Sequence, residues 1–129
     1  MPAPDRPAVT VESLRGSRIV DEPSNLDAII GALPAQVVAL RFAPDEALLL
    51  GGSAFSFDDA IVEPETGFVA VTVDREVVAR HTEWPLPETG VVAQGAIAGV
   101  PAKLAWLPDG RAWIVTQAAY LADLLDRLT

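Results

Sequence analysis

The order of apolar segments in the second half of the chain is the feature that limits the fold most. Over residues 68–128 the pattern predicts a strand, a helix, three strands and a final helix. Residues 68–73 alternate Phe, Ala and Thr with three valines, which is typical of a strand buried on one face. A helix is expected to follow up to about residue 83, with Asp74 as its N-cap and with Val77 and Val78 in the core.

Three strands are expected between the two helices, over residues 91–100, 102–107 and 112–116. The first two are predicted to join at residues 99–101, which read Gly-Val-Pro. The third follows a turn at residues 108–110, where Gly110 supplies the positive φ that such turns often require. The terminal helix is predicted over residues 117–128, because apolar residues recur there at helical spacing. These residues are Tyr120, Leu121, Leu124, Leu125 and Leu128.

The first half of the chain is less regular. A short helix is expected over residues 26–33, capped by Ser24 or Asn25 and ended by Pro34. Residues 37–42 and 47–50 are expected to pair as a hairpin. The fold class that follows is α+β, an antiparallel sheet with two or three helices packed on one face.

The N-terminal residues 1–25 are rich in proline and charge, and they are expected to be flexible or loosely packed. Their scattered apolar residues could also form a short strand. Residues 26–129 are expected to form a single α+β domain. Between residues 55 and 66 the chain is mixed, and Asp58, Asp59, Glu63, Pro64 and Glu65 are expected to lie in a solvated loop.

Composition limits the partners. The 129-residue chain has nine basic and eighteen acidic side chains, a net charge of −9 and no cysteine. Such a charge disfavours binding to nucleic acid and to anionic membrane surfaces. No apolar run approaches the ~20 residues of a membrane span. The lack of cysteine suits a reducing compartment, so a soluble, cytoplasmic protein is expected.

Several segments together carry a resemblance to a known family. They are VAVTVDREVVAR at 69–80, WPL at 84–86, AQGAIAGVPAKLAWLPDGRAWIVT at 93–116 and AYLADLL at 119–125. In order and spacing, these segments resemble the gamma subunit of heterotetrameric sarcosine oxidase. That subunit is similar to part of the folate-binding aminomethyltransferase fold of the glycine-cleavage T protein. The resemblance covers the second half of the chain and extends to the hairpin at 40–50, whereas the first forty residues look unlike the family.

The resemblance implies an accessory subunit that lies beside flavin-bearing partners in an enzyme oxidising an N-methyl amino acid. In true aminomethyltransferases, an aspartate in the strand pair after the first helix contacts the substrate amine. The matching stretch here, residues 95–107, contains no Asp or Glu, and Lys103 with the nearby Gln94 supplies its polar character. This departure argues against independent aminomethyltransferase activity.

Five residues are candidates for a ligand-binding or partner-binding surface. Trp106 and Trp113 flank the turn at residues 108–110 and could meet across the hairpin. Core or cross-strand packing is favoured for both, and the alternative is an aromatic contact for a partner subunit or a flat ligand such as a pterin. Arg41, Lys103 and Arg111 could supply cations to a flat anionic ligand such as a pterin, or could be ordinary surface charges.

No catalytic residue and no metal ligand is assigned. His81 is the only histidine, and a structural or solvated role at the end of a helix is favoured over catalysis. The acidic group of Asp58, Asp59, Glu63 and Glu65 lacks the spacing of a calcium loop. Residues 51–53 lack the pattern of a phosphate-binding loop.

Three functions therefore remain open. The first is a non-catalytic accessory subunit or binding module that acts by protein–protein contact with flavoprotein oxidase subunits. The second is a small stand-alone one-carbon protein that binds tetrahydrofolate. No cofactor is expected in the isolated chain apart from this possible tetrahydrofolate. The third is a scaffold that forms a homo-oligomer through an exposed strand at residues 37–42.

Overall fold

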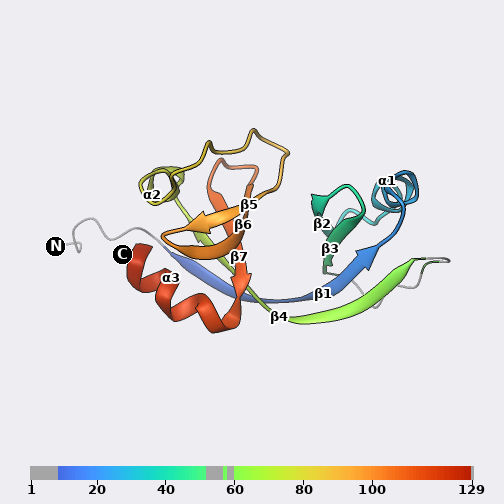
Figure 1. The fold of residues 1–129 in the computed structure, drawn as a ribbon, viewed down its shortest axis with the longest axis horizontal. Coiled ribbons are helices and arrows are strands. Elements are labelled where there is room, and N and C mark those ends of the chain that lie inside the picture. The colour runs from blue at the N-terminus through green and yellow to red at the C-terminus, as the bar shows by residue number, and fades with distance from the viewer. Residues whose placement is uncertain (1–8, 52–56, 58–59, 129) are drawn as a thin grey trace. The chain divides into compact units, whose positions relative to one another are not determined.

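The computed structural model describes residues 9–51, 57 and 60–128. Seven strands and three α-helices are found in these residues, in the chain order β1, α1, β2, β3, β4, α2, β5, β6, β7 and α3 (Figure 1). The strands are hydrogen-bonded in the order β2-β3-β1-β4-β7-β6-β5. The pairs with a defined register are all antiparallel. The expected α+β class, an antiparallel sheet with helices, is confirmed.

The chain divides into two compact units. We call Met1–Ser13 with Phe68–Thr129 the terminal unit, and Leu14–Gly67 the central unit. The two long strands, β1 (Thr10–Val20) and β4 (Ile61–Val73), each contribute residues to both units. The predicted division into a flexible or loosely packed segment 1–25 and a single domain 26–129 stays a prediction.

The terminal unit is built on the second part of β4 and on three further strands. These are β5 (Ala93–Ile97), β6 (Val100–Trp106) and β7 (Ala112–Gln117). Val71 of β4 pairs with Ile114 of β7, which in turn pairs with Leu104 of β6. Residues that pair across antiparallel strands lie on the same face, so these three apolar side chains form one continuous surface. All three are fully buried.

Two helices cover this surface, which we call the helix face. Helix α2 (Arg75–Ala79) buries Val77 and Val78, as the sequence predicts, although it ends four residues earlier than expected. Helix α3 (Leu121–Leu128) buries Leu124 and Leu128. All four side chains belong to the same apolar cluster as the strand residues. The two helices therefore stabilise one face of the β4-β7-β6-β5 strands.

One of the two hairpin turns of the terminal unit lies where the sequence predicts it, and the other does not. Gly110 has a φ of 88°, and its N–H donates to the carbonyl of Leu107 at 2.9 Å, which confirms the predicted turn. The predicted junction at residues 99–101 is wrong. The β5–β6 turn lies at Ala98 and Gly99, which both have positive φ, 51° and 79°, as two-residue hairpin turns of the favoured type require.

Pro101, which was expected in the junction between the two strands, lies inside β6 opposite Ala96. The C-terminal segment also begins differently from the prediction. Residues Ala118–Tyr120 form a short 3-10 helix, and the regular helix starts only at Leu121.

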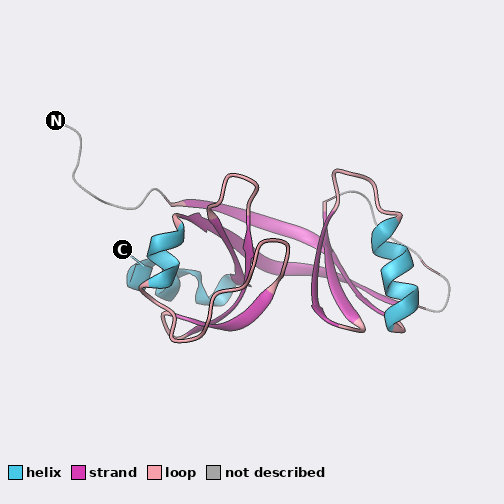
Figure 2. Cartoon of the chain, turned by 90° about the horizontal axis from the view of Figure 1, so that it is seen from above, coloured by secondary structure: helices cyan, strands magenta, loops and turns pink. Residues whose placement is uncertain are grey.

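The central unit consists of the second part of β1, α1 (Pro23–Gly31), β2 (Val38–Ala43), β3 (Glu46–Leu50) and the first part of β4. The predicted hairpin of β2 and β3 is confirmed. Helix α1 begins earlier than predicted, because Pro23 occupies its first turn, where the missing N–H costs nothing. The N-cap is Glu22, and neither Ser24 nor Asn25 caps the helix. Helix α1 lies beside the strands of the central unit (Figure 2). Its residue Leu26 packs with Ile19, Ala47 and Leu49 of these strands.

Two segments expected to be irregular are strands. Glu63, Pro64 and Glu65 were expected in a solvated loop, but they lie inside the 13-residue strand β4. Asp58 and Asp59 lie outside the described residues. In the N-terminal segment, residues 10–20 form β1, which is the strand alternative for this region. Among the residues that the structure describes, no helix is long and apolar enough to cross a membrane.

Because Ile19 is fully buried and packs against α1, Ile19→Ala is expected to lower the free energy of unfolding by about 2–5 kcal/mol. Val11 lies in the same strand and is 42% exposed, so Val11→Ala is the matched control and should change stability by less than about 0.5 kcal/mol. Urea unfolding followed by circular dichroism measures both. Equal effects of the two substitutions would show that residues 10–20 contribute no buried core.

Candidate functional site

The face of the terminal unit opposite the helix face carries a shallow basin of about 260 Å³. The strand register places its side chains. Lys103 of β6 pairs with Gln94 of β5 on one side and with Val115 of β7 on the other. In the adjacent row, Gln117 of β7 pairs with Phe68 of β4. Tyr120 of the 3-10 helix also lines the basin.

Among the described residues that line the basin, Lys103 is the charged one, and it is the only lysine in the sequence. Its Nζ lies 5.1 Å from the centre of the Phe68 ring, within the range of a cation–π contact. Val115, beneath it, is 1% exposed. The arrangement thus combines one cation, one aromatic ring, two amides and one phenol above an apolar floor. Such a mixture suits a small ligand or a partner's side chain.

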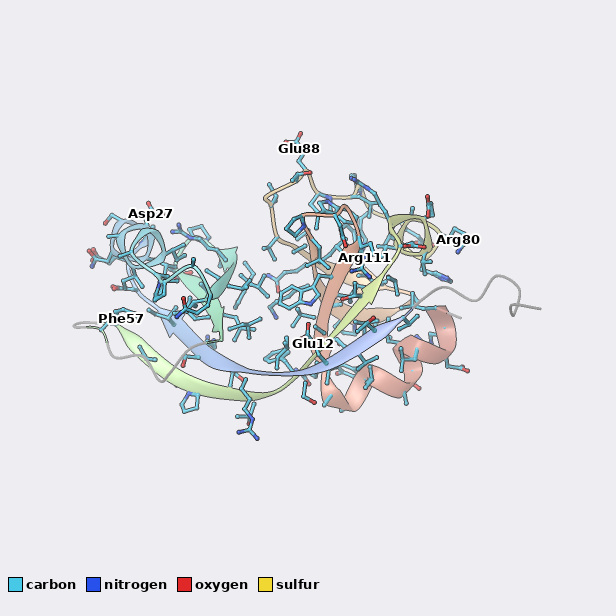
Figure 3. The ribbon with its side chains drawn as sticks, turned by 180° about the vertical axis from the view of Figure 1, so that it is seen from behind. Glu12, Asp27, Phe57, Arg80, Glu88 and Arg111 are labelled. Atoms are coloured by element: carbon cyan, nitrogen blue, oxygen red, sulfur yellow. The ribbon has the colours of Figure 1, made fainter. Side chains whose placement is uncertain are left out.

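Trp113 lies on the same face as Lys103, two residue pairs along the hairpin. It is 8% exposed, and its Nε1 donates to Oε1 of Glu12 in β1 at 3.2 Å. Figure 3 labels Glu12 on that strand. Trp113 therefore packs as a core residue that is anchored through its polar end.

Trp106 lies on the helix face, opposite Ala112. Its Nε1 donates to the carbonyl of Pro87 at 2.6 Å, and the guanidinium of Arg75 lies 4.2 Å from the ring centre. The prediction that Trp106 and Trp113 meet across the hairpin is wrong. Trp113 pairs with Ala105, whereas Trp106 pairs with Ala112. The two tryptophans therefore belong to neighbouring residue pairs of the hairpin, and their rings point to opposite faces.

Trp84 plays a role that the sequence did not reveal. Its Nε1 donates to the carbonyl of Ala96 in β5 at 2.8 Å. Its ring lies on Gly95, where a Cβ would approach Trp84 to 2.7 Å. Together, Trp84 and Trp106 hold the connection between α2 and β5 against the sheet. The contact of the Trp84 ring with β5 requires glycine at position 95, because a side chain there would collide with the ring.

The two candidate arginines lie elsewhere. Arg111 follows the β6–β7 turn, and its Nε donates to Oδ2 of Asp109 at 2.8 Å (Figure 3). Arg41 belongs to β2 of the central unit, where its guanidinium pairs with Asp27 and donates to the carbonyls of Pro23 and Pro44. Of the five candidate residues, the structure brings Lys103 and Trp113 to one face and places the other three elsewhere.

Asp109 has a pKa below its usual range. The main cause is the backbone N–H of Arg111, which donates to Oδ1 of Asp109 at 3.0 Å, and the Arg111 side chain adds to the effect. The charged carboxylate is thus the form that the turn stabilises.

His81 lies beyond the end of α2 and lines a second cavity of about 440 Å³ with Arg80, Glu83 and Trp84. Its backbone carbonyl accepts a bond from the N–H of Ala98 at 2.8 Å, which ties the helix end to the β5–β6 turn. Figure 3 shows Arg80 at the outer side of α2. Within residues 9–51, 57 and 60–128, no three His, Asp or Glu side chains are grouped so as to hold a metal ion.

Phe68, Gln117 and Tyr120 line the basin but were not singled out from the sequence. A signal existed for Phe68 and Gln117, because a correct register of β4 and β7 places them opposite each other. No sequence pattern marks Tyr120, which was assigned to the apolar face of the terminal helix and is 37% exposed instead.

Comparison with solved structures finds a similar chain in the heterotetrameric sarcosine oxidase from Corynebacterium sp. U-96 in complex with pyrrole 2-carboxylate. The TM-score is 0.68 and the sequence identity 14%, and the alignment covers 93% of this chain and 81% of that chain. At this identity the similarity shows the fold alone. No protein-family model matches the chain. No curated protein matches it either.

Asp109→Asn is expected to destabilise the protein at about pH 7 and to have a smaller effect at about pH 3. A depressed pKa in the folded state adds stability above the ordinary aspartate value of 3.8, and this stability is lost as the pH falls through the folded value. Chemical unfolding at both pH values tests this. Arg111→Gln, which keeps the backbone N–H of residue 111, should destabilise less at neutral pH. A loss from Asp109→Asn that does not change with pH would contradict the explanation.

Proposed function

We propose that this chain is a non-catalytic accessory subunit that acts by protein–protein contact in an amine-oxidising flavoenzyme complex. The observation that carries the proposal is the fold similarity, which extends over 93% of the chain to a chain of a heterotetrameric oxidase. In such a complex the flavin-bearing partners perform the oxidation. The accessory chain contributes a binding surface for these partners and stabilises the complex.

The contacts of the tryptophans support the same proposal. The indole N–H groups of Trp84 and Trp106 donate to the carbonyls of Ala96 and Pro87. The indole N–H of Trp113 donates to the carboxylate of Glu12. Aromatic side chains used in this way hold a scaffold together. The stretch that would carry the substrate-contacting acid of an aminomethyltransferase also contains no Asp or Glu.

Tetrahydrofolate binding stays a prediction. Of the residues expected to bind it, Lys103 lines the basin, and the ring beside Lys103 is that of Phe68 and not that of Trp106 or Trp113. Its volume of about 260 Å³ lies below the ~300–1,000 Å³ typical of sites for drug-sized ligands, which argues for a smaller ligand there.

A pull-down tests the accessory role. The tagged chain, expressed in its native cells, is expected to co-purify with flavin-containing subunits that oxidise an N-methyl amino acid. The chain purified alone should show neither flavin absorbance nor turnover. His81→Ala serves as a control variant that should keep both the capture and the activity of the complex, because the hydrogen bonds that join His81 to other described residues, Val78 and Ala98, are made by its backbone. Turnover by the isolated chain that this substitution abolishes would overturn the proposal.

A second candidate function, self-association, is supported by the strand order. Strand β2 lies at one end of the order, and Val38 in it is 46% exposed. Arg41 is the one charged residue in β2, and its guanidinium forms an ion pair with Asp27 of α1. It therefore does not protect the edge of the strand from pairing with another strand. An edge strand without an exposed charge is a template for pairing with a second strand.

The edge contact predicts a dimer whose population rises with concentration in sedimentation velocity. Val38→Lys is expected to weaken the dimer by about tenfold or more, because it places a charge on the pairing edge. Val11→Lys is the matched control, since Val11 is similarly exposed at 42% and lies in β1, which is flanked by strands on both sides. A monomer at all concentrations, or equal effects of the two substitutions, would exclude association through β2.

A further inference from the structure

The β6–β7 turn contains the only Asp–Gly pair in the sequence, Asp109 and Gly110. An aspartate that precedes glycine can react with its own backbone, because glycine has no Cβ to shield its nitrogen. The Asp109 side chain is 53% exposed. Apart from its chain neighbours, no described atom lies within 4 Å of the position that a Cβ on Gly110 would take. Water therefore reaches this bond, and burial does not protect it.

The reaction available to this pair is the formation and hydrolysis of a succinimide. The backbone nitrogen of Gly110 attacks Cγ of Asp109 and loses its proton, while the Cγ–OH bond breaks and one water molecule leaves. Water then adds to one of the two carbonyls of the five-membered ring. Ring opening restores aspartate or gives isoaspartate, in which the main chain runs through the β-carboxyl group. Nothing is oxidised or reduced, and water is the sole co-reactant.

The closed turn holds the nitrogen that would attack. The N–H of Gly110 donates to the carbonyl of Leu107 at 2.9 Å, and the N–H of Leu107 donates to the carbonyl of Arg111 at 2.9 Å. The nitrogen of Gly110 must give up its hydrogen bond before it can lose the proton and attack, and breaking this bond costs free energy.

The turn also holds the carboxyl group that would be attacked. Oδ1 of Asp109 accepts a hydrogen bond from the backbone N–H of Arg111 at 3.0 Å, and Oδ2 accepts one from Nε of Arg111 at 2.8 Å. Both bonds stabilise the ionised carboxylate, and the backbone bond is the main cause of the lowered pKa of Asp109. An ionised carboxylate has no hydroxyl group that can leave as water. Both oxygen atoms are also bound to residue 111, one residue beyond the nitrogen that Cγ must meet.

We propose that Asp109–Gly110 is a site of spontaneous isoaspartate formation, which the β6–β7 turn keeps unreactive while its hydrogen bonds to Leu107 and Arg111 are closed. The rate of modification then reports how often the turn opens locally. Isoaspartate inserts one methylene into the main chain next to the last pair of the hairpin, Trp106 and Ala112, so the modified turn loses its original geometry. The proposal does not depend on the accessory-subunit function.

Incubation in ¹⁸O-labelled water tests the proposal, because each passage through the succinimide leaves one ¹⁸O atom in residue 109. The full-length chain is kept at neutral pH, either folded or unfolded in guanidinium chloride, and is then digested with trypsin in ordinary water. Lys103 and Arg111 are both cleavage sites, so the peptide 104–111 isolates the pair. Mass spectrometry measures its ¹⁸O content, and electron-transfer fragmentation measures its isoaspartate.

The unfolded chain is expected to accumulate both ¹⁸O and isoaspartate in this peptide. The folded chain should do so at least about tenfold more slowly, because the turn must open first. The bonds that follow Asp27 and Asp74 are internal controls, since alanine and arginine come next in the chain. Both should react more slowly than Asp109–Gly110 in the unfolded chain, because a side chain shields the attacking nitrogen.

A pair of variants separates the turn from overall stability. Arg111→Gln removes the contact to Oδ2 and keeps the backbone N–H, so it should accelerate labelling of the folded chain by about twofold to fivefold, as befits an exposed ion pair. The unfolded rate should stay unchanged. Arg18→Gln is the matched control, because it removes a guanidinium that pairs with Glu46 and Glu63 in the central unit. It should label residue 109 as the wild type does.

Three results would overturn the proposal. The first is the absence of ¹⁸O and isoaspartate at residue 109 in the unfolded chain, which would mean that the bond does not react. The second is an equal rate in the folded and unfolded chains, which would mean that the turn does not hold the reaction back. The third is equal acceleration by Arg111→Gln and Arg18→Gln, which would mean that global unfolding, and not the turn, controls the reaction.

Discussion

The burial of one apolar sheet face beneath α2 and α3 is the interaction on which the terminal unit depends. Val71, Leu104 and Ile114 come from three neighbouring strands and are held in one plane by their pairing register. The helices add Val78 and Leu124, which are also fully buried. Burial of each such side chain contributes roughly 1.5–3 kcal/mol, so this cluster stabilises the unit more than any hydrogen bond in it.

The opposite face of the same strands carries the basin around Lys103. Because side chains alternate along a strand, the pairing that buries Leu104 and Ile114 also places Lys103 and Val115 together on the opposite side. The helix face needs apolar residues at every position, whereas the other face tolerates polar ones at its rim. The basin follows from this division, with a buried floor at Val115 and polar groups around it.

The tryptophans show how a long connection is fixed without regular structure. Between α2 and β5 the chain runs through residues 80–92 with few backbone hydrogen bonds of its own. Two tryptophans supply the missing contacts. Trp84, in the connection, donates to Ala96 of the sheet, and Trp106, in the sheet, donates to Pro87 of the connection. Arg75 covers Trp106 from α2. A chain that commits its largest aromatic residues to its own folding is well suited to present a rigid surface to other subunits, as proposed here for an oxidase complex.

Local patterns in the sequence determined much of this protein: the strand at Phe68–Val73, the buried pair Val77 and Val78, the β2–β3 hairpin and the turn at Gly110. Each of these depends on residues close together in the chain, so periodicity and turn chemistry suffice to predict them. Only the tertiary structure decided that residues 61–73 form one strand, that residues 10–20 join the sheet, and that Trp106 and Trp113 point apart. These features are set by pairing between distant segments, and a shift of one residue in register exchanges the two faces of a strand. For the same reason the basin around Lys103, formed by residues from Phe68 to Tyr120, has no signature in the sequence.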